Sequence, residues 1–251
     1  MTGITRELRI RPLTGLPELG EGDEIGRLIA DSAAPTAEDV VVVSQKAVSK
    51  VEGRVRSLAD VEPGGRALEL ARELGKEPAM VELVLSESAR VVRAERGVLI
   101  TETHDGWVCA NAGIDTSNLA DGEVSLLPVD GDASARRIRG EIATAAGAAP
   151  AVVIADSFGR AWRVGQADVA IGCAGIEPLA DWRSRQDRGG RELSATLIAI
   201  ADELASAADL ARDKDSGAPG AVISGLGDLV TADDGPGAGP LRRPAQDDLF
   251  R

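Results

Sequence analysis

Asp156 and Ser157 open the stretch of the chain that is richest in residue types able to do chemistry. Residues 156–168 read Asp-Ser-Phe-Gly-Arg-Ala-Trp-Arg-Val-Gly-Gln-Ala-Asp and directly follow an apolar run. A carboxylate beside a hydroxyl suits a Mg²⁺ ion bridged to phosphates, and Arg160 and Arg163 can bind anionic groups through their planar forks. We expect Asp156 to end a buried strand, and we expect this patch to be functional because scaffold alone does not explain its composition.

A second polar patch, residues 111–118, reads Asn-Ala-Gly-Ile-Asp-Thr-Ser-Asn and follows a predicted β-hairpin. Its small residues allow the backbone to approach a ligand closely. Asp115 offers a hard oxygen ligand, and Asn118 offers an amide that can both donate and accept hydrogen bonds. The same composition is typical of an Asx-type turn, so the residue types leave a ligand site and a plain turn both open.

A third polar patch, residues 44–54, follows the valine-rich segment 39–44, which we predict to be a buried strand. The patch contains Gln45, Lys46 and Lys50. Cationic groups at the end of a buried strand are suited to binding phosphate. The solvated end of a hairpin would have a similar composition, so two interpretations are open here as well.

The elements that must position these patches combine strands and helices without regular alternation. Strands are predicted over residues 8–13, 39–44, 90–93, 98–101, 107–110, 151–155 and 221–224. Helices are predicted up to about residue 30, over 65–73, 77–86 and 133–147 (with Asp132 as its cap), and over 192–212 as the longest helix. Hairpin-like strand pairs beside packed helices favour an α+β fold with mixed sheets. We expect the Gly/Pro-rich segment 225–240 to be a mobile loop.

The composition excludes several classes of function. The chain of 251 residues carries a formal net charge of −13 and has no basic run longer than two residues, which argues against a nucleic-acid partner. No stretch approaches the length of an apolar membrane span, and the N-terminus lacks an apolar signal core. We therefore expect no membrane association and a cytoplasmic location. Aromatic residues make up only 2%, so the core must be aliphatic.

Cysteine and histidine give no support to other chemistries. Cys109 and Cys173 form neither a disulfide framework nor a metal-spaced pair, so we expect two buried, small hydrophobic side chains in a reducing compartment. The single histidine, His104, lies in a predicted turn and does not indicate a catalytic triad. The glycine-rich signatures of P-loop and dinucleotide-binding folds are absent from the sequence.

Taken together, the three patches resemble one family, the coenzyme F(420)-0:γ-glutamyl ligases (CofE), whose domain also forms the N-terminal half of FbiB. The resemblance covers nearly the whole chain and is carried by residues 16–19, 48–54, 100–103, 112–118, 126–130, 156–163, 165–166, 201–205 and 248–250. It implies a CofE-like ligase fold that forms one unit over 1–251, with two intertwined subdomains as an option, and a homodimer. We expect the flavin-binding half of FbiB to be absent.

The resemblance also implies ligands at matching positions. A guanine nucleotide would be held by Leu16, Pro17, Glu18, Leu19, Gln45, Lys46, Lys50 and Asn118. One divalent ion, Mg²⁺ or Mn²⁺, would bind Asp115 and Asp156, a second would bind Ser157, and K⁺ is a further candidate ion. Asp115, Asp156 and Arg160 would be the catalytic residues.

One segment departs from the family pattern. Residues 212–219 correspond to a stretch that contacts nucleotide and metal in the family, and Asp213-Lys214 stands where the family has Gly-Gln. Asp213 or Asp215 could then complete the second metal site.

The implied reaction is the GTP-dependent addition of L-glutamate to the coenzyme precursor F(420)-0. Phosphoryl transfer from GTP would turn a carboxylate into an acyl phosphate, which the glutamate amine would attack, with release of GDP and phosphate. Three alternatives stay open: a ligase of this scaffold for another carboxylate acceptor, a phosphotransferase that stops at the acyl phosphate, and a non-catalytic nucleotide-binding module.

Overall fold

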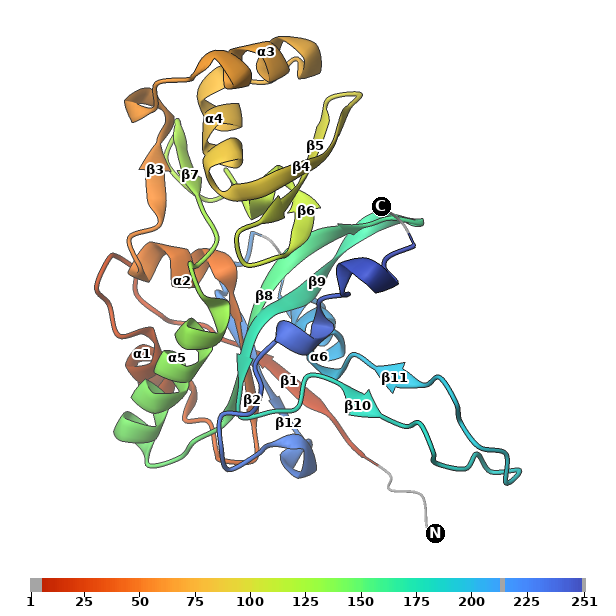
Figure 1. Cartoon of the computed structure of the whole chain (residues 1–251). Helices are drawn as coiled ribbons and strands as arrows, with labels where there is room; N and C mark the ends of the chain where they lie inside the picture. Colours follow the sequence, from red (N-terminus) through yellow and green to blue (C-terminus); the bar gives the residue numbers. More distant parts are fainter. Residues whose placement is uncertain (1–5, 213–214, 250–251) are drawn as a thin grey trace.

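A mixed five-stranded sheet forms the centre of the molecule (Figure 1). The computed structural model describes residues 6–212 and 215–249. The strand order is β1 (Arg9–Pro12), β12 (Gly220–Ser224), β2 (Val40–Ser44), β8 (Ala151–Arg160) and β9 (Arg163–Ala174). Only β2 and β8 pair in parallel; the other neighbours are antiparallel. With helices beside it, this sheet confirms the predicted α+β class.

Strand β2 explains why the sheet needs cover on both faces. Val40 to Val43 are fully buried, and their side chains alternate between two hydrophobic cores. On one face the core includes α1 (Ile25–Ala33) and α5 (Gly131–Ala146), and on the other it includes α6 (Ile200–Asp209). A continuous apolar run of this kind is typical of a strand that is buried on both faces.

Helices α1 and α5 approach each other closely at Gly26. A Cβ atom at this position would lie 2.5 Å from the carbonyl oxygen of Ile138. The backbone N–H of Gly26 donates to Oε2 of Glu141 at 2.7 Å. A larger residue would therefore push the two helices apart.

A second group of elements packs around its own core above the sheet (Figure 1). It comprises α3 (Gly65–Leu74), α4 (Pro78–Ser86), and the sheet of β4 (Ser88–Glu95), β5 (Val98–Thr103) and β6 (Val108–Ala110). The pair β3 (Val55–Ser57) and β7 (Glu123–Ser125) connects it to the rest of the chain. These helices and this hairpin agree with the predicted elements.

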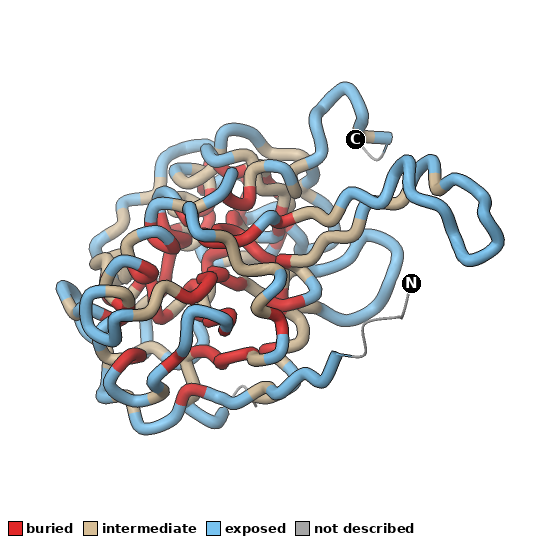
Figure 2. Tube along the Cα trace, turned by 90° about the horizontal axis from the view of Figure 1, so that it is seen from below, coloured by how far each residue is buried: buried red, intermediate tan, exposed pale blue. Residues whose placement is uncertain are grey.

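The predicted helix over 192–212 is wrong at its start. Residues 180–198 form an exposed arm, which includes β10 (Ala180–Asp181) and β11 (Leu197–Ile198) (Figure 2). The backbone N–H of Leu193 donates to Arg185 at 2.8 Å across this arm. Because the backbone of residues 180–198 pairs across the arm, helix α6 begins only at Ile200. Helix α5 is therefore the longest helix in the described part of the chain.

The expected cap of α5 is also wrong, because Asp130 rather than Asp132 accepts the N–H of Ala133, at 2.8 Å. Asp132 instead accepts the backbone N–H groups of Cys173 at 2.9 Å and Ala238 at 2.8 Å. It thereby ties segment 225–240 to the sheet. That segment contains the short 3₁₀ helix Gly227–Leu229, and a second 3₁₀ helix, Gly239–Leu241, begins at its end. The mobility of the segment stays a prediction.

Across the described residues, no helix combines the length and the apolar character that a membrane crossing requires.

Candidate active site

A cavity of about 400 Å³ opens where six segments meet. These are the loop before α1, the start of helix α2 (Gln45–Val51), the turn at 115–118, the middle of β8 and β9, and residues around the end of α6. The predicted site residues in its lining are Leu16, Pro17, Glu18, Leu19, Gln45, Lys46, Lys50, Asp115, Asn118, Asp156 and Ser157. A cavity of this size can hold a small organic ligand.

The polar patch after β2 is a helix, so the interpretation as a solvated hairpin end does not hold. Ser44 caps α2, and its Oγ accepts the N–H of Ala47 at 3.4 Å. Gln45 is buried, and its Oε1 lies 2.9 Å from Oγ of Ser49, which also lies 2.6 Å from the carbonyl oxygen of Leu126. These contacts tie α2 to Leu126, the residue directly after β7, and fix the side chain of Gln45, which lines the cavity.

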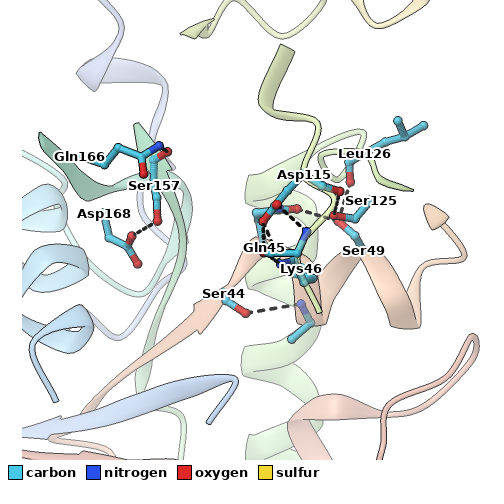
Figure 3. Close-up of polar contacts among 12 residues, drawn as sticks. Ser44, Gln45, Lys46, Ser49, Asp115, Ser125, Leu126, Ser157, Gln166 and Asp168 are labelled. Carbon is cyan, nitrogen blue, oxygen red and sulfur yellow. Dashed lines mark hydrogen bonds and ion pairs between the residues drawn. The ribbon is translucent and has the colours of Figure 1, made fainter. Parts of the chain in front are cut away.

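Asp115 lies in an Asx-type turn and also faces the cavity, so both interpretations of its patch apply. Ser117 donates from its backbone N–H to Oδ1 at 2.8 Å and from its hydroxyl to Oδ2 at 2.9 Å. Lys46 places its Nζ 2.8 Å from Oδ2 (Figure 3). Burial raises the pKa of Asp115, but the hydrogen bonds from Lys46 and Ser117 outweigh it and lower the pKa overall. Asp115 therefore presents a carboxylate.

Asp156 and Ser157 lie in the middle of β8, and the prediction that the strand ends at Asp156 is wrong. Asp156 pairs with Val169 and Ser157 pairs with Asp168 on β9. The ladder continues as far as Arg160, although exposure rises along it. Backbone pairing with β9 carries the strand beyond the core, because a ladder needs no apolar side chains to satisfy its backbone groups.

Among the catalytic, nucleotide-binding and metal-binding residues predicted above that the structure describes, Arg160 is the one outside the cavity lining. It lies at the turn between β8 and β9, and its guanidinium donates to the carbonyl oxygens of Val164 at 3.0 Å and Gly165 at 3.4 Å. Trp162 is 78% exposed beside it. The structure thus places Arg160 at the tip of a hairpin and away from Asp115 and Asp156, and its catalytic role stays a prediction.

The structure adds Asp168 and Asp209 to the cavity lining, and the sequence prediction did not name either as a site residue. Arg212 and Asp215, from the segment 212–219 that the resemblance implied as a nucleotide and metal contact, line the cavity as well. Asp168 is almost fully buried and forms an ion pair with Arg212. One signal was available for Asp168, because it is the only charged residue in the otherwise uncharged strand stretch 164–174.

Asp213 and Lys214, the pair that departs from the family pattern, and Phe250 of the terminal motif lie outside the described residues. Asp215 is described and reaches the cavity.

The two cysteines are free and buried, as predicted. Burial and the nearby charge of Asp156 raise the pKa of Cys109 to about 12. Burial also raises the pKa of Cys173 to about 12, together with the charges of Asp132 and Glu177. Neither thiol is therefore suited to act as a nucleophile at neutral pH.

The donor atoms of the cavity fit a hard divalent cation in kind. Asp115, Asp156 and Ser157 offer only carboxylate and hydroxyl oxygens, which Mg²⁺ and Mn²⁺ prefer. Within the described residues, no three acidic, histidine or cysteine side chains cluster closely enough to hold an ion alone. Phosphate and water oxygens would have to complete the coordination shell, as is usual for Mg²⁺ at nucleotide sites.

Comparison with known proteins identifies the family. The family model for F(420)-0:gamma-glutamyl ligase matches residues 15–225. The chain belongs to this family. The resemblance that the three polar patches indicated is thereby confirmed, and the matched residues include every predicted site residue from Leu16 to Arg160.

Curated relatives extend the match to nearly full length. A protein named coenzyme F(420):L-glutamate ligase from Methanothermobacter thermautotrophicus is 41% identical over 243 residues, which cover 94% of this chain and 96% of the relative. The protein of the same name from Methanopyrus kandleri is 41% identical over 247 residues, which cover 97% and 98%. That from Methanocaldococcus jannaschii is 40% identical over 233 residues, which cover 92% of each chain.

Proposed function

We propose that this protein is a GTP-dependent amide ligase that adds L-glutamate to the coenzyme precursor F(420)-0. The observation that carries the proposal is that Asp115, Asp156 and Ser157, from distant parts of the sequence, line one cavity in a chain of the F(420)-0:gamma-glutamyl ligase family. The names of the relatives support glutamate as the amine substrate.

The proposed chemistry begins by activating a carboxylate. The γ-phosphoryl group of GTP moves to a carboxylate oxygen of F(420)-0, which gives GDP and an acyl phosphate. The amine of glutamate attacks the acyl carbon, phosphate leaves, and the nitrogen loses a proton as the amide forms. The protein's task in such a transfer is to position the reactants and to balance charge.

The residues of the cavity have distinct tasks in this proposal. Asp115, Asp156 and Ser157 would hold Mg²⁺ or Mn²⁺ ions, which neutralise phosphate charge when bound. Lys46 pairs with Asp115, and Lys50 pairs with Glu18. Both lysines lie in the cavity lining, where their ammonium groups can turn to phosphate oxygens while a cation takes the carboxylate. In this way an acidic protein can bind anionic substrates.

The test is to incubate the protein with F(420)-0, L-glutamate, GTP and Mn²⁺ and to analyse the products by mass spectrometry. We expect an added glutamate and equal amounts of GDP and phosphate, which depend on every component. Phosphate release without an amide product would favour the phosphotransferase. GTP binding without turnover would favour the nucleotide-binding module. Glutamylation of a different carboxylate would favour a ligase of this scaffold with another acceptor.

The variant Asp156→Ala sharpens this test. Loss of a cation ligand should lower turnover by about two orders of magnitude or more, while the thermal melting temperature should stay close to that of the wild type. Asp121→Ala is the matched control, because Asp121 is exposed and outside the cavity lining. Turnover of Asp156→Ala near the wild-type value would refute the metal assignment.

A further inference from the structure

Asp168 is a buried residue in the cavity wall, and three of its oxygen atoms each contact another side chain. Its Oδ1 accepts the hydroxyl of Ser157 at 2.5 Å, across the β8–β9 ladder (Figure 3). Its Oδ2 forms an ion pair with Arg212, just beyond the end of α6. Its backbone carbonyl accepts the hydroxyl of Ser206, on α6, at 2.7 Å. Asp168 is therefore fixed from both neighbouring elements.

The contact with Asp168 determines whether the hydroxyl of Ser157 presents a donor or an acceptor to the cavity. An ionised carboxylate can only accept hydrogen bonds, so Ser157 must donate its proton to Asp168. The hydroxyl oxygen then meets the cavity as an acceptor, which is what a hard cation requires of a ligand. Outer groups that orient a ligand in this way commonly tune metal affinity.

The ion pair with Arg212 keeps Asp168 in this role. Both side chains are nearly buried. A buried carboxylate that left its guanidinium partner would pay a large desolvation cost. Asp168 lines the cavity, but both of its carboxylate oxygens contact Ser157 or Arg212. Its role therefore differs from that of Asp115 and Asp156, which we propose as cation ligands.

We propose that Asp168 is a positioning residue that orients the hydroxyl of Ser157 toward a divalent cation bound with nucleotide. This inference rests on the metal site of the proposed function. Asp168 acts through Ser157, and Arg212 holds Asp168 in place.

The experiment measures the dissociation constant of GTP by calorimetry, with Mn²⁺ present and with a chelator, in the absence of F(420)-0 and glutamate. The proteins compared are wild type, Asp168→Asn, Ser157→Ala and the double variant. We expect Asp168→Asn to weaken Mn²⁺-dependent binding by about 10- to 100-fold and to leave binding in chelator unchanged. The double variant should bind no more weakly than Ser157→Ala, because two residues that act through one contact are not additive.

Two further variants control for general damage. Asp234→Asn breaks the pair between Asp234 and the nearly buried Arg139, outside the cavity lining, and should leave Mn²⁺-dependent binding unchanged. Asp168→Glu keeps the charge beside Arg212 but displaces the carboxylate, and it replaces Asp168→Asn if that variant does not fold. It should melt cooperatively and still weaken Mn²⁺-dependent binding.

Two results would overturn the inference alone: unchanged Mn²⁺-dependent binding in the Asp168 variants, or a double variant clearly weaker than Ser157→Ala. Failure of the proposed function looks different. In that case wild-type protein would bind GTP no more tightly with Mn²⁺ than with chelator, and the metal site would be lost together with the inference.

Discussion

Two aspartate–cation pairs border the same cavity but differ in their surroundings. The Lys46–Asp115 pair is open to solvent, with side chains 16% and 39% exposed. The Arg212–Asp168 pair is nearly closed, with side chains 9% and 3% exposed. Solvent can replace either partner in the open pair at low cost. In the closed pair, loss of one partner leaves a charge without compensation. The open pair is therefore suited to exchanging ligands, and the closed pair is suited to holding the wall in place.

Removing the cation from the closed pair should have the largest effect on stability. We expect Arg212→Met to lower the free energy of unfolding by about 3–5 kcal/mol, because Asp168 stays buried without its partner. Urea unfolding followed by circular dichroism measures this loss. The double variant Arg212→Met, Asp168→Leu removes both charges and should recover much of the stability. A loss below about 1 kcal/mol in the single variant would place this pair with ordinary surface pairs.

Removing the negative charge of Asp115 from the open pair should lower turnover but change stability little. We expect Asp115→Asn to lower turnover by about 100-fold, or about 2.7 kcal/mol, since an amide is a weaker cation ligand. Stability should change by less than about 1 kcal/mol, because an asparagine can still accept the N–H of Ser117 in the turn. Turnover with GTP, glutamate and F(420)-0 and urea unfolding should be measured together.

The control for Asp115→Asn is Asp121→Asn, which removes an equal, exposed charge outside the cavity lining. Asp121→Asn should change neither turnover nor the free energy of unfolding. A large stability loss with normal turnover in Asp115→Asn would reverse the contrast between the two pairs.

The sequence predicted both members of the open pair as site residues, although not their pairing, and it assigned no individual role to either member of the closed pair. Asp115 and Lys46 each lie in a short polar patch beside an apolar strand, which is a local signal. Asp168 is the last residue of the polar patch 156–168, and Arg212 is the first residue of the segment 212–219. No pattern in the sequence links the two across the 44 positions that separate them. Their pairing depends on how α6 packs on β9, which no local pattern encodes.

For Arg160 the sequence prediction fails in the opposite way, because it groups residues that the structure separates. It is only four residues from Asp156, so the sequence places both in one patch. A strand rises about 3.3 Å per residue, and β8 continues to Arg160. The extended chain therefore carries Arg160 far from the carboxylates, whereas a turn after Asp156 would have kept them together. The arm at 180–198 was missed for a related reason, because apolar spacing at 193–200 resembles a helix.

Asp39 provides the smallest test, since it resembles Asp115 in its pKa but lies outside the cavity lining. It accepts the backbone N–H of Thr36 at 2.7 Å and the hydroxyl of Thr36 at 2.9 Å. Burial raises the pKa of Asp39, but hydrogen bonds from Ser224 and Thr36 and the charge of Arg11 outweigh it, so the pKa lies below its ordinary value of 3.8. Its contribution to stability is therefore complete above pH 3.8 and is lost as the pH falls through the lower, folded-state pKa.

Asp39→Asn should consequently lower the free energy of unfolding by about 1 kcal/mol at pH 7 and leave turnover unchanged. The difference from wild type should shrink as the pH falls below about 4, which urea unfolding at a series of pH values measures. A difference that stays constant down to pH 3 would mean that the charge of Asp39 contributes nothing. A fall in turnover would mean that an aspartate with a lowered pKa can be functional even when it lies outside the cavity lining. The comparison of the open Lys46–Asp115 pair with the closed Arg212–Asp168 pair would then no longer indicate which residues are functional.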